Sequence, residues 1–224
     1  MQSVFKVKHF HFPYENLKFP GQHSEEKILF ITREGSLIVR SKILTLISVY
    51  IFGLVFAPVT FARAELFSFH FSAIILPFII FWTASCLFVY WWIRKVWQKT
   101  LFIITTRRLT KFIHTTPWTR YQMSLTLEKI VDTGSYRKGF LQMITGYGYF
   151  VARSAAGAVK NFKIINISFA EDLHNYVNKL LFIYNEKQKQ LDKFRPFIPG
   201  MKGKKRDEFV RKTTPKYAKP KRGK

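Results

Sequence analysis

Two long apolar stretches without a charged residue dominate the pattern of hydrophobic and polar positions. They are residues 43–61, ILTLISVYIFGLVFAPVTF, and residues 71–93, FSAIILPFIIFWTASCLFVYWWI. A helix needs about 20 apolar residues to cross the core of a bilayer, so each stretch is long enough. The connector at residues 62–70 is too short for a domain, so the pattern predicts a helical hairpin that crosses a membrane twice. The alternative is a buried hairpin of a soluble protein, which would need much of the 224-residue chain to cover it.

Basic residues flank the two stretches on the sides away from the connector. Arg40 and Lys42 precede the first stretch, Arg94 and Lys95 follow the second, and the connector carries one arginine and one glutamate. Because Lys and Arg accumulate on the cytoplasmic side of membrane helices, both termini are expected in the cytoplasm. The first 42 residues lack the apolar core of a cleavable signal peptide, so the first stretch is expected to direct insertion into the cytoplasmic (inner) membrane.

Individual residues in and near the stretches support an anchor. Trp91, Trp92 and Trp97 fall where the second stretch ends, as interfacial tryptophans do. Gly53, Ala84 and Ser85 are small residues that would permit close packing of the hairpin against other membrane helices. Neither stretch contains an ionisable Asp, Glu, Lys, Arg or His, which favours an anchor over a transport pathway. Cys86 is the one cysteine, so no disulfide forms within the chain, in keeping with a reducing cytoplasm.

Beyond residue 100 the apolar runs become short and often alternate with polar residues. β-branched and aromatic residues predict six strands, at residues 101–105, 109–115, 121–127, 130–136, 146–154 and 159–167. We expect the third strand to pair with the fourth and the fifth with the sixth, because each pair is joined by a short connection. The stretch at residues 139–144 predicts a short helical or irregular link between the two pairs.

An amphipathic helix is predicted after the last strand. Ser168 and Glu171 fit a capping box, in which each side chain accepts from the other's backbone amide. Apolar residues then recur at helical spacing as far as Tyr184 and would pack on the sheet. The fold class predicted for the chain is therefore α+β, with a transmembrane helical hairpin followed by a small antiparallel β-barrel that the C-terminal helix caps.

Four motifs in this region have the order and spacing of a known domain. They are ITTRRL at 104–109, LTLEKIVD at 125–132, LQMITGYGYFVARS at 141–154 and FAEDLHNYVNKL at 169–180. Residues 97–183 thereby resemble the bacterial pleckstrin-homology-like (YdbS-like) domain family, and FPGQHSEEKIL at 19–29 resembles the segment before its membrane hairpin. The resemblance implies a PH-like domain at 97–185 that binds lipid, peptide or another subunit and has no catalytic residues.

The charge balance points to a polyanionic partner. The chain has 37 Lys and Arg against 13 Asp and Glu, a net charge of +24, and most of the excess follows the second apolar stretch. Anionic cytoplasmic leaflets attract such residues, and nucleic acid is the other polyanion that does so. The candidate contacts for anionic lipid or a partner are Arg107, Arg108, Lys111, Arg137, Lys138, Lys160 and Lys163.

The last segment, residues 186–224, is rich in Lys, Pro and Gly and loses apolar periodicity after Phe194. Such a composition buries too little apolar surface to offset chain entropy, so the sequence predicts a disordered basic tail. It would keep the protein soluble and on the cytoplasmic side, attach to anionic lipid, or contact RNA, DNA or a ribosome. The candidate polyanion contacts are Lys202, Lys204, Lys205, Arg206, Lys219, Lys221 and Arg222.

No pattern predicts catalysis, a metal or a cofactor. His9 and His11 lie two residues apart but lack neighbouring cysteine or carboxylate ligands for zinc. The motif GYG at 146–148 precedes a strand rather than a helix and lacks the lysine of a phosphate-binding loop, so it predicts a tight turn.

Three functional hypotheses remain open at this point. The leading one is a non-enzymatic, membrane-anchored binding or scaffold protein that contacts anionic lipid and binds a partner, or itself, through a strand edge or the open end of the barrel. A second is a membrane tether for RNA or the ribosome that acts through the basic tail. A third is an accessory subunit of an envelope or export complex.

Overall fold

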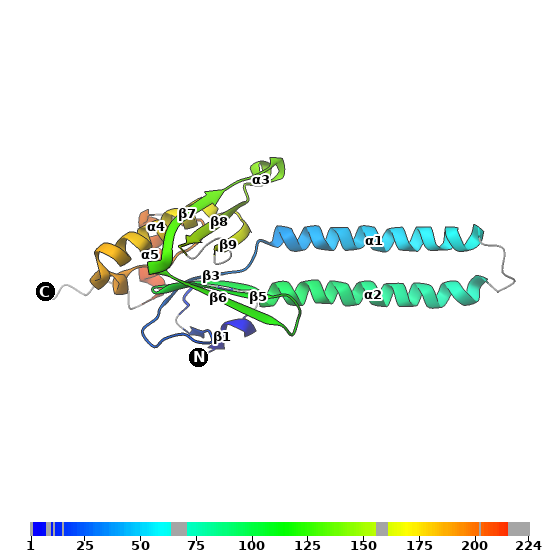
Figure 1. Cartoon of the computed structure of the whole chain (residues 1–224), viewed down its shortest axis with the longest axis horizontal. Coiled ribbons are helices and arrows are strands. Elements are labelled where there is room, and N and C mark those ends of the chain that lie inside the picture. Colours follow the sequence, from blue (N-terminus) through cyan, green and yellow to red (C-terminus); the bar gives the residue numbers. More distant parts are fainter. Residues whose placement is uncertain are drawn as a thin grey trace.

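Two long helices project side by side from a folded domain (Figure 1). The computed structural model describes residues 2–7, 10, 12–14, 16–63, 71–155, 161–201 and 203–214. The helices are α1 (Ser36–Arg63) and α2 (Phe71–Lys99). Both are long and apolar enough to cross a membrane, and no residue in the most apolar window of either is buried. The two predicted apolar helices are confirmed, and both extend further toward the domain than the charge-free stretches do.

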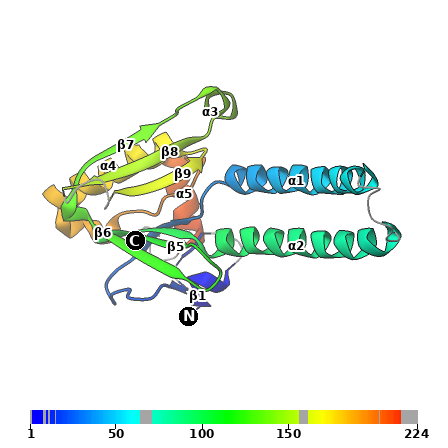
Figure 2. The ribbon, with the colours of Figure 1, turned by 45° about the vertical axis from the view of Figure 1, so that its right-hand side comes forward.

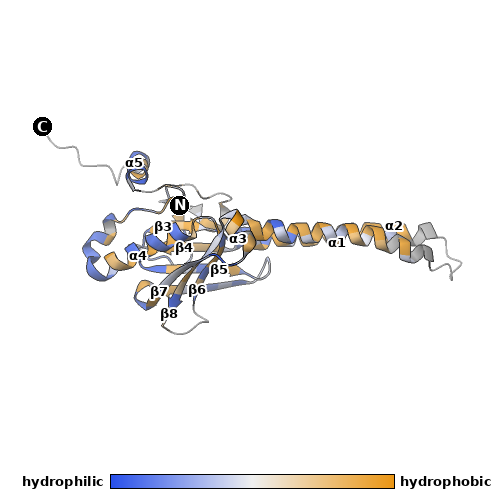
Figure 3. Ribbon diagram, turned by 90° about the horizontal axis from the view of Figure 1, so that it is seen from above, coloured by the Kyte–Doolittle hydropathy of each residue, from blue (hydrophilic) through white to orange (hydrophobic). Residues whose placement is uncertain are grey.

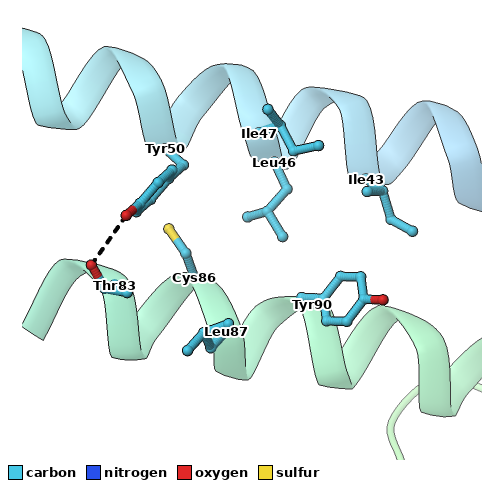
Figure 4. Close-up of a pocket in the computed structure, with 8 residues that line it drawn as sticks. All are labelled: Ile43, Leu46, Ile47, Tyr50, Thr83, Cys86, Leu87 and Tyr90. Carbon is cyan, nitrogen blue, oxygen red and sulfur yellow. Dashed lines mark hydrogen bonds between the residues drawn. The ribbon is translucent and has the colours of Figure 1, made fainter.

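The two helices touch at a glycine. A Cβ atom added to Gly53 would lie 2.4 Å from Cε2 of Trp82, so only glycine lets the indole pack there. Trp82 Nε1 donates to the Tyr50 carbonyl at 3.3 Å, and the hydroxyls of Tyr50 and Thr83 are 3.3 Å apart. Figure 4 shows the Tyr50–Thr83 contact beside an apolar groove that runs between the helices toward the domain. Gly53 thus lets the two helices of the hairpin approach each other, whereas its predicted role in packing against other membrane helices stays a prediction.

The domain contains two antiparallel sheets. The four-stranded sheet has the order β3 (Ile28–Thr32), β4 (Leu101–Thr105), β5 (Arg108–His114), β6 (Arg120–Thr126). The three-stranded sheet has the order β7 (Ile130–Tyr136), β8 (Gly148–Ser154), β9 (Phe162–Ile167). The short helix α3 (Phe140–Thr145) joins β7 to β8, as the sequence predicted.

Three sheet predictions were wrong or incomplete. β6 and β7 lie in different sheets instead of pairing, because the turn at η2 (Leu127–Lys129) carries the chain from one sheet to the other. Strands β3 to β9 therefore divide into two antiparallel sheets, and their closure into a barrel is not shown. β3, from before the hairpin, pairs with β4 and was not predicted as part of the domain. The pairing of β8 with β9 is confirmed.

The main core lies between the two sheets and α4 (Ala170–Glu186). Leu173, Val177 and Leu180 of α4 are fully buried against β7 and β8. The predicted capping box is wrong, since α4 begins after Phe169 and no side chain caps it. The ring of Phe169 packs edge-on against Phe30 at 5.5 Å, so core packing rather than a serine hydroxyl fixes the start of the helix.

The predicted tail is partly folded. It forms η4 (Gln188–Lys193) and α5 (Gly203–Thr213), so the prediction of disorder is wrong for these segments. Phe194 and Phe197 are buried beside Tyr176, and Phe197 N donates to the Leu29 carbonyl at 3.0 Å. The two aromatic side chains fill the core, which outweighs the polar composition around them. Residues 215–224 lie outside the described part of the chain.

The N-terminal segment covers the other face of the four-stranded sheet. It contains β1 (Gln2–Ser3), η1 (Val4–Lys6) and β2 (Leu17–Lys18), and β1 pairs with β2 in parallel. Its buried apolar residues form a second cluster with the sheet, made of Val4, Tyr14, Phe19, Ile28, Ile31, Leu101, Ile103 and Phe112. β3, β4 and part of β5 are thus buried on both faces, whereas β6 is mostly exposed. Many apolar residues of α1 and α2, the helices that Figure 3 colours as largely hydrophobic, are exposed.

Candidate membrane-facing surface

The predicted basic residues do not form one site. β4 follows α2 directly and runs away from it, so Arg107 and Arg108, at the turn after β4, lie at the end of the domain distal to the helices. Arg137 and Lys138 follow β7 at the opposite end, where the backbone amide of Gly35 before α1 donates to the Ile165 carbonyl at 3.2 Å. Lys160 lies outside the described residues.

At the distal end Arg108 is held by a buried carboxylate. Its Nε and Nη2 donate to Glu26 Oε1 and Oε2 at 3.0 and 2.9 Å, and Thr105 Oγ1 donates to Oε1 at 2.7 Å. Burial alone would raise the pKa of the Glu26 carboxyl, but these donors outweigh it and hold that pKa below its ordinary value. Arg108 is thereby engaged inside the protein.

The neighbouring Arg107 is more exposed but is also paired, through an ion pair with Glu25. Arg107 and Arg108 line a pocket of about 500 Å³ whose other polar groups include Glu128, which accepts from the Tyr184 hydroxyl at 2.7 Å. The distal pocket is therefore lined by both arginine and glutamate side chains, which disfavours it as a binding site for an anion.

Two other candidates, Lys111 and Lys163, are brought together between the sheets. Lys111 Nζ donates to the Lys163 carbonyl at 3.3 Å and lies 5.0 Å from the ring centre of Phe102. Burial lowers the pKa of Lys111, the charge of Glu34 partly opposes this, and the charge of Lys163 lowers that pKa further. Lys163 Nζ lies 4.5 Å from the ring centre of Tyr149, so both ammonium groups rest on aromatic faces.

The joint between helices and domain is organised by Arg33. Its Nε donates to the Gln98 carbonyl at 2.9 Å and its Nη2 to the Val7 carbonyl at 2.7 Å. The guanidinium lies 5.7 Å from the ring centre of Trp97, whose Nε1 donates to the Glu34 carbonyl at 2.9 Å. These contacts join the end of α2 to the segment that leads into α1, a structural role that flank charge alone did not predict.

An aromatic cluster surrounds the end of α2 nearest the domain. Trp118, in the loop after β5, is 73% exposed and lies 6.5 and 5.3 Å from the ring centres of Trp91 and Trp92. Lys99 Nζ donates to the Pro117 carbonyl at 2.7 Å in the same loop. Exposed tryptophans beside lysine are typical of a membrane interface. Sequence reasoning missed Trp118, although an exposed turn tryptophan after Pro117 was a usable signal.

The remaining predicted contacts have mixed placements. Arg137 forms an ion pair with Glu171 at 3.2 Å, and Lys138 is exposed at the base of α3. On α5, Lys204 and Lys205 are exposed, whereas the Arg206 guanidinium lies 5.9 Å from the ring centre of Tyr176. Outside the described residues lie Lys202, Lys219, Lys221 and Arg222.

Comparisons with known proteins do not assign a family. No family model matches the chain, and no curated protein matches it. A crystal structure of a DUF1696 family protein with a pleckstrin-homology domain from Shewanella loihica PV-4 is 12% identical. The match covers 37% of this chain and 68% of that chain, with a TM-score of 0.28, which is too low to assign a fold or a function. The PH-like and YdbS-like assignments therefore stay predictions from the sequence.

Metal ligands do not gather in the part of the chain that the structure describes. No group of three or more His, Cys, Asp or Glu side chains is close enough there to hold an ion. His9 and His11 lie outside the described residues. Chemical features that the described surface does offer are cations, tryptophans and apolar side chains around the bases of α1 and α2, which suit a lipid surface.

Proposed function

We propose that α1 and α2 anchor this protein in the cytoplasmic membrane and hold a non-enzymatic, PH-like binding domain against the anionic leaflet. The observation that carries the proposal is the apolar surface of two adjacent helices that the domain leaves uncovered. An exposed apolar surface that extends along two helices marks a contact with a membrane or a protein. In this arrangement a membrane covers both helices, and the positive flanks support a cytoplasmic position for the domain.

The domain then binds a partner, or a second copy, through the edge of β6. β6 pairs with β5 alone among the described strands, so its other edge is open to strand addition. Tyr121 on this strand is 57% exposed, which supplies an aromatic side chain for such a contact.

Alkaline extraction of cell membranes tests the anchor. We expect the full chain to stay in the pellet after a carbonate wash, because two apolar helices hold it through hydrophobic burial rather than charge. Protease added to sealed inverted vesicles is expected to cleave the domain, and protease added to intact spheroplasts is expected to leave it intact. Release by carbonate, or cleavage from the outside, contradicts the proposal.

Affinity purification tests the partner and the tail hypothesis together. The matched shorter chain ends at Thr214, because an earlier end would remove Phe194 and Phe197 from the core. A protein partner retained by both chains supports a binding domain. RNA or ribosomes lost with residues 215–224 would instead favour the tether hypothesis.

A further inference from the structure

The link between β7 and β8 carries exposed apolar side chains at its tip. Phe140, Met143 and Ile144 of α3 are 77%, 74% and 66% exposed. Their spacing of three and four residues places them on one face of a helical turn. Side chains of this size are ordinarily withdrawn from water, so a cluster of three at a protruding tip marks a contact surface.

The tip is braced against the base of α1. Gln142 Nε2 donates to Asn166 Oδ1 at 3.2 Å, and Gln142 Oε1 accepts from the Lys138 amide at 2.9 Å. Asn166 in turn touches the residue before α1, because a Cβ atom on Gly35 would lie 1.4 Å from the Asn166 carbonyl oxygen. The polar side of α3 is therefore tied to the domain, which leaves the apolar face outward and fixes it relative to α1.

The position of the tip matches that of the membrane surface expected from the helices. In Figures 1 and 2, α3 reaches the level at which α1 and α2 leave the domain. On the α2 side, the exposed Trp118 lies beside Trp91 and Trp92. Exposed apolar and aromatic side chains thus flank the helix pair on two sides.

The charges near the tip suit a lipid headgroup layer. Lys138 is exposed directly before α3, and Arg137 is partly exposed in its ion pair with Glu171. Apolar side chains with adjacent cations are the composition of segments that lie in the membrane interface. A protein groove would bury the apolar face equally well, but the link from α3 through Gln142 and Asn166 to the base of α1 favours the bilayer.

We propose that α3 is a third membrane contact that inserts Phe140, Met143 and Ile144 into the interface of the leaflet that α1 and α2 enter from the domain. Lys138 lies among anionic headgroups in this arrangement. This inference rests on the proposed function, since it needs the helices to be in a bilayer. With this third contact the tilt of the domain on the membrane is fixed more firmly than by the two helices alone, which join the domain at one place.

Site-specific labelling of the full chain tests the contact. In a Cys86→Ser background, single cysteines are introduced as Met143→Cys at the tip, Val131→Cys as the control and Ile47→Cys inside α1. Val131 is 71% exposed near the end of β7 away from α3, so it matches the tip in exposure but not in position. Each variant carries the same polarity-sensitive fluorophore in vesicles of phosphatidylcholine and phosphatidylglycerol, with the domain facing outward.

We expect the label at position 143 to be quenched by a nitroxide placed high on the lipid acyl chain and to lose most of its quenching by aqueous iodide. The label at position 131 is expected to show the reverse. Phe140→Cys serves as a second tip variant if Met143→Cys fails to fold.

Two results have different meanings. If the label at position 47 is quenched by a deep lipid nitroxide while both tip labels respond to iodide as position 131 does, the α3 contact is overturned and the anchor stands. If the label at position 47 is not quenched by lipid, the anchor itself is wrong, and the α3 contact falls with it.

Discussion

The two ends of the domain engage their cations differently, although Arg137 at the end beside the helices is also paired, with Glu171. At the distal end, Arg108 is paired with the buried Glu26, and Arg107 is paired with Glu25. At the end beside the helices, Lys138 is exposed, and it adjoins the apolar tip of α3. A net charge of +24 thus overstates the number of cations available to a polyanion, because several of them are paired inside the protein.

The largest effect is expected at the distal end, from Glu26→Ala. The substitution leaves Arg108 partly buried without its carboxylate, which costs about 3 kcal/mol when one partner of a buried pair is removed. Thermal unfolding of the full chain in detergent measures it as a lower midpoint. The control is Glu25→Gln, because its exposed pair with Arg107 contributes less than about 1 kcal/mol. Equal shifts for the two variants would mean that burial of Glu26 has no special effect.

A smaller loss is expected at the helix joint, from Gly35→Ala. The new methyl group meets the Asn166 carbonyl at 1.4 Å, so β9 and the start of α1 must move apart. We expect a destabilisation of about 2 kcal/mol, typical of overpacking. The same variant should loosen α3, seen as lower fluorescence anisotropy of a label at position 143. An unchanged unfolding midpoint would show that the joint is more plastic than the contact implies.

The pH dependence of stability also separates the ends. Burial, and then the charges of Lys99 and Arg120, lower the pKa of His114 near the helix joint. The unfolded chain protonates this imidazole near its ordinary pKa of about 6.5, before the folded chain does, so stability falls as the pH drops through that value. Glu26, whose folded pKa is also lowered, stops contributing only at lower pH, as the pH falls through the carboxyl range.

Two substitutions check the assignment to His114. His114→Gln is expected to reduce the change of the unfolding midpoint with pH between about pH 7 and pH 5. His23→Gln, at an exposed position, should leave that pH dependence in place. A slope that survives His114→Gln would assign the proton to another group.

The smallest effect on stability is expected at the tip, from Ile144→Asp. The side chain is exposed, so the free energy of unfolding in detergent should change by less than about 0.5 kcal/mol. In vesicles, however, a charge on the apolar face should restore iodide quenching of a label at position 143. Val131→Asp is the matched control and should leave that quenching low. If both substitutions, or neither, changed iodide quenching of the label at position 143, the two ends would not differ in their contact with the membrane.

Much of the fold was predictable because it depends on local pattern. The two apolar helices and the alternation in β6 were evident in the sequence, although α1 and α2 are longer than the charge-free stretches. β3 was missed because it is short. Its few apolar residues stand just before a longer apolar helix and give no separate strand signal. Phe194 and Phe197 were missed because their neighbours have the composition of a disordered segment, and only the core shows where the two rings pack.

The candidate site was harder to predict. Arg108 and Glu26 are 82 residues apart, so their pairing is a long-range contact that no local pattern carries. A usable signal existed: with 37 Lys and Arg against 13 Asp and Glu, an acidic residue such as Glu26 is expected to pair with a cation. The tip of α3 was predicted as a connection, but its exposure was not.

The sequence by itself determined that the chain has two apolar helices, a strand-rich basic domain and a helix after the strands. The length of an apolar stretch and the period of its apolar residues are set by neighbouring residues, so both can be read from the sequence. The tertiary structure alone decided which cations are paired, which strands share a sheet and where α3 lies relative to α1. Those features depend on contacts between residues distant in the chain, which form only when the core and the helix joint have packed.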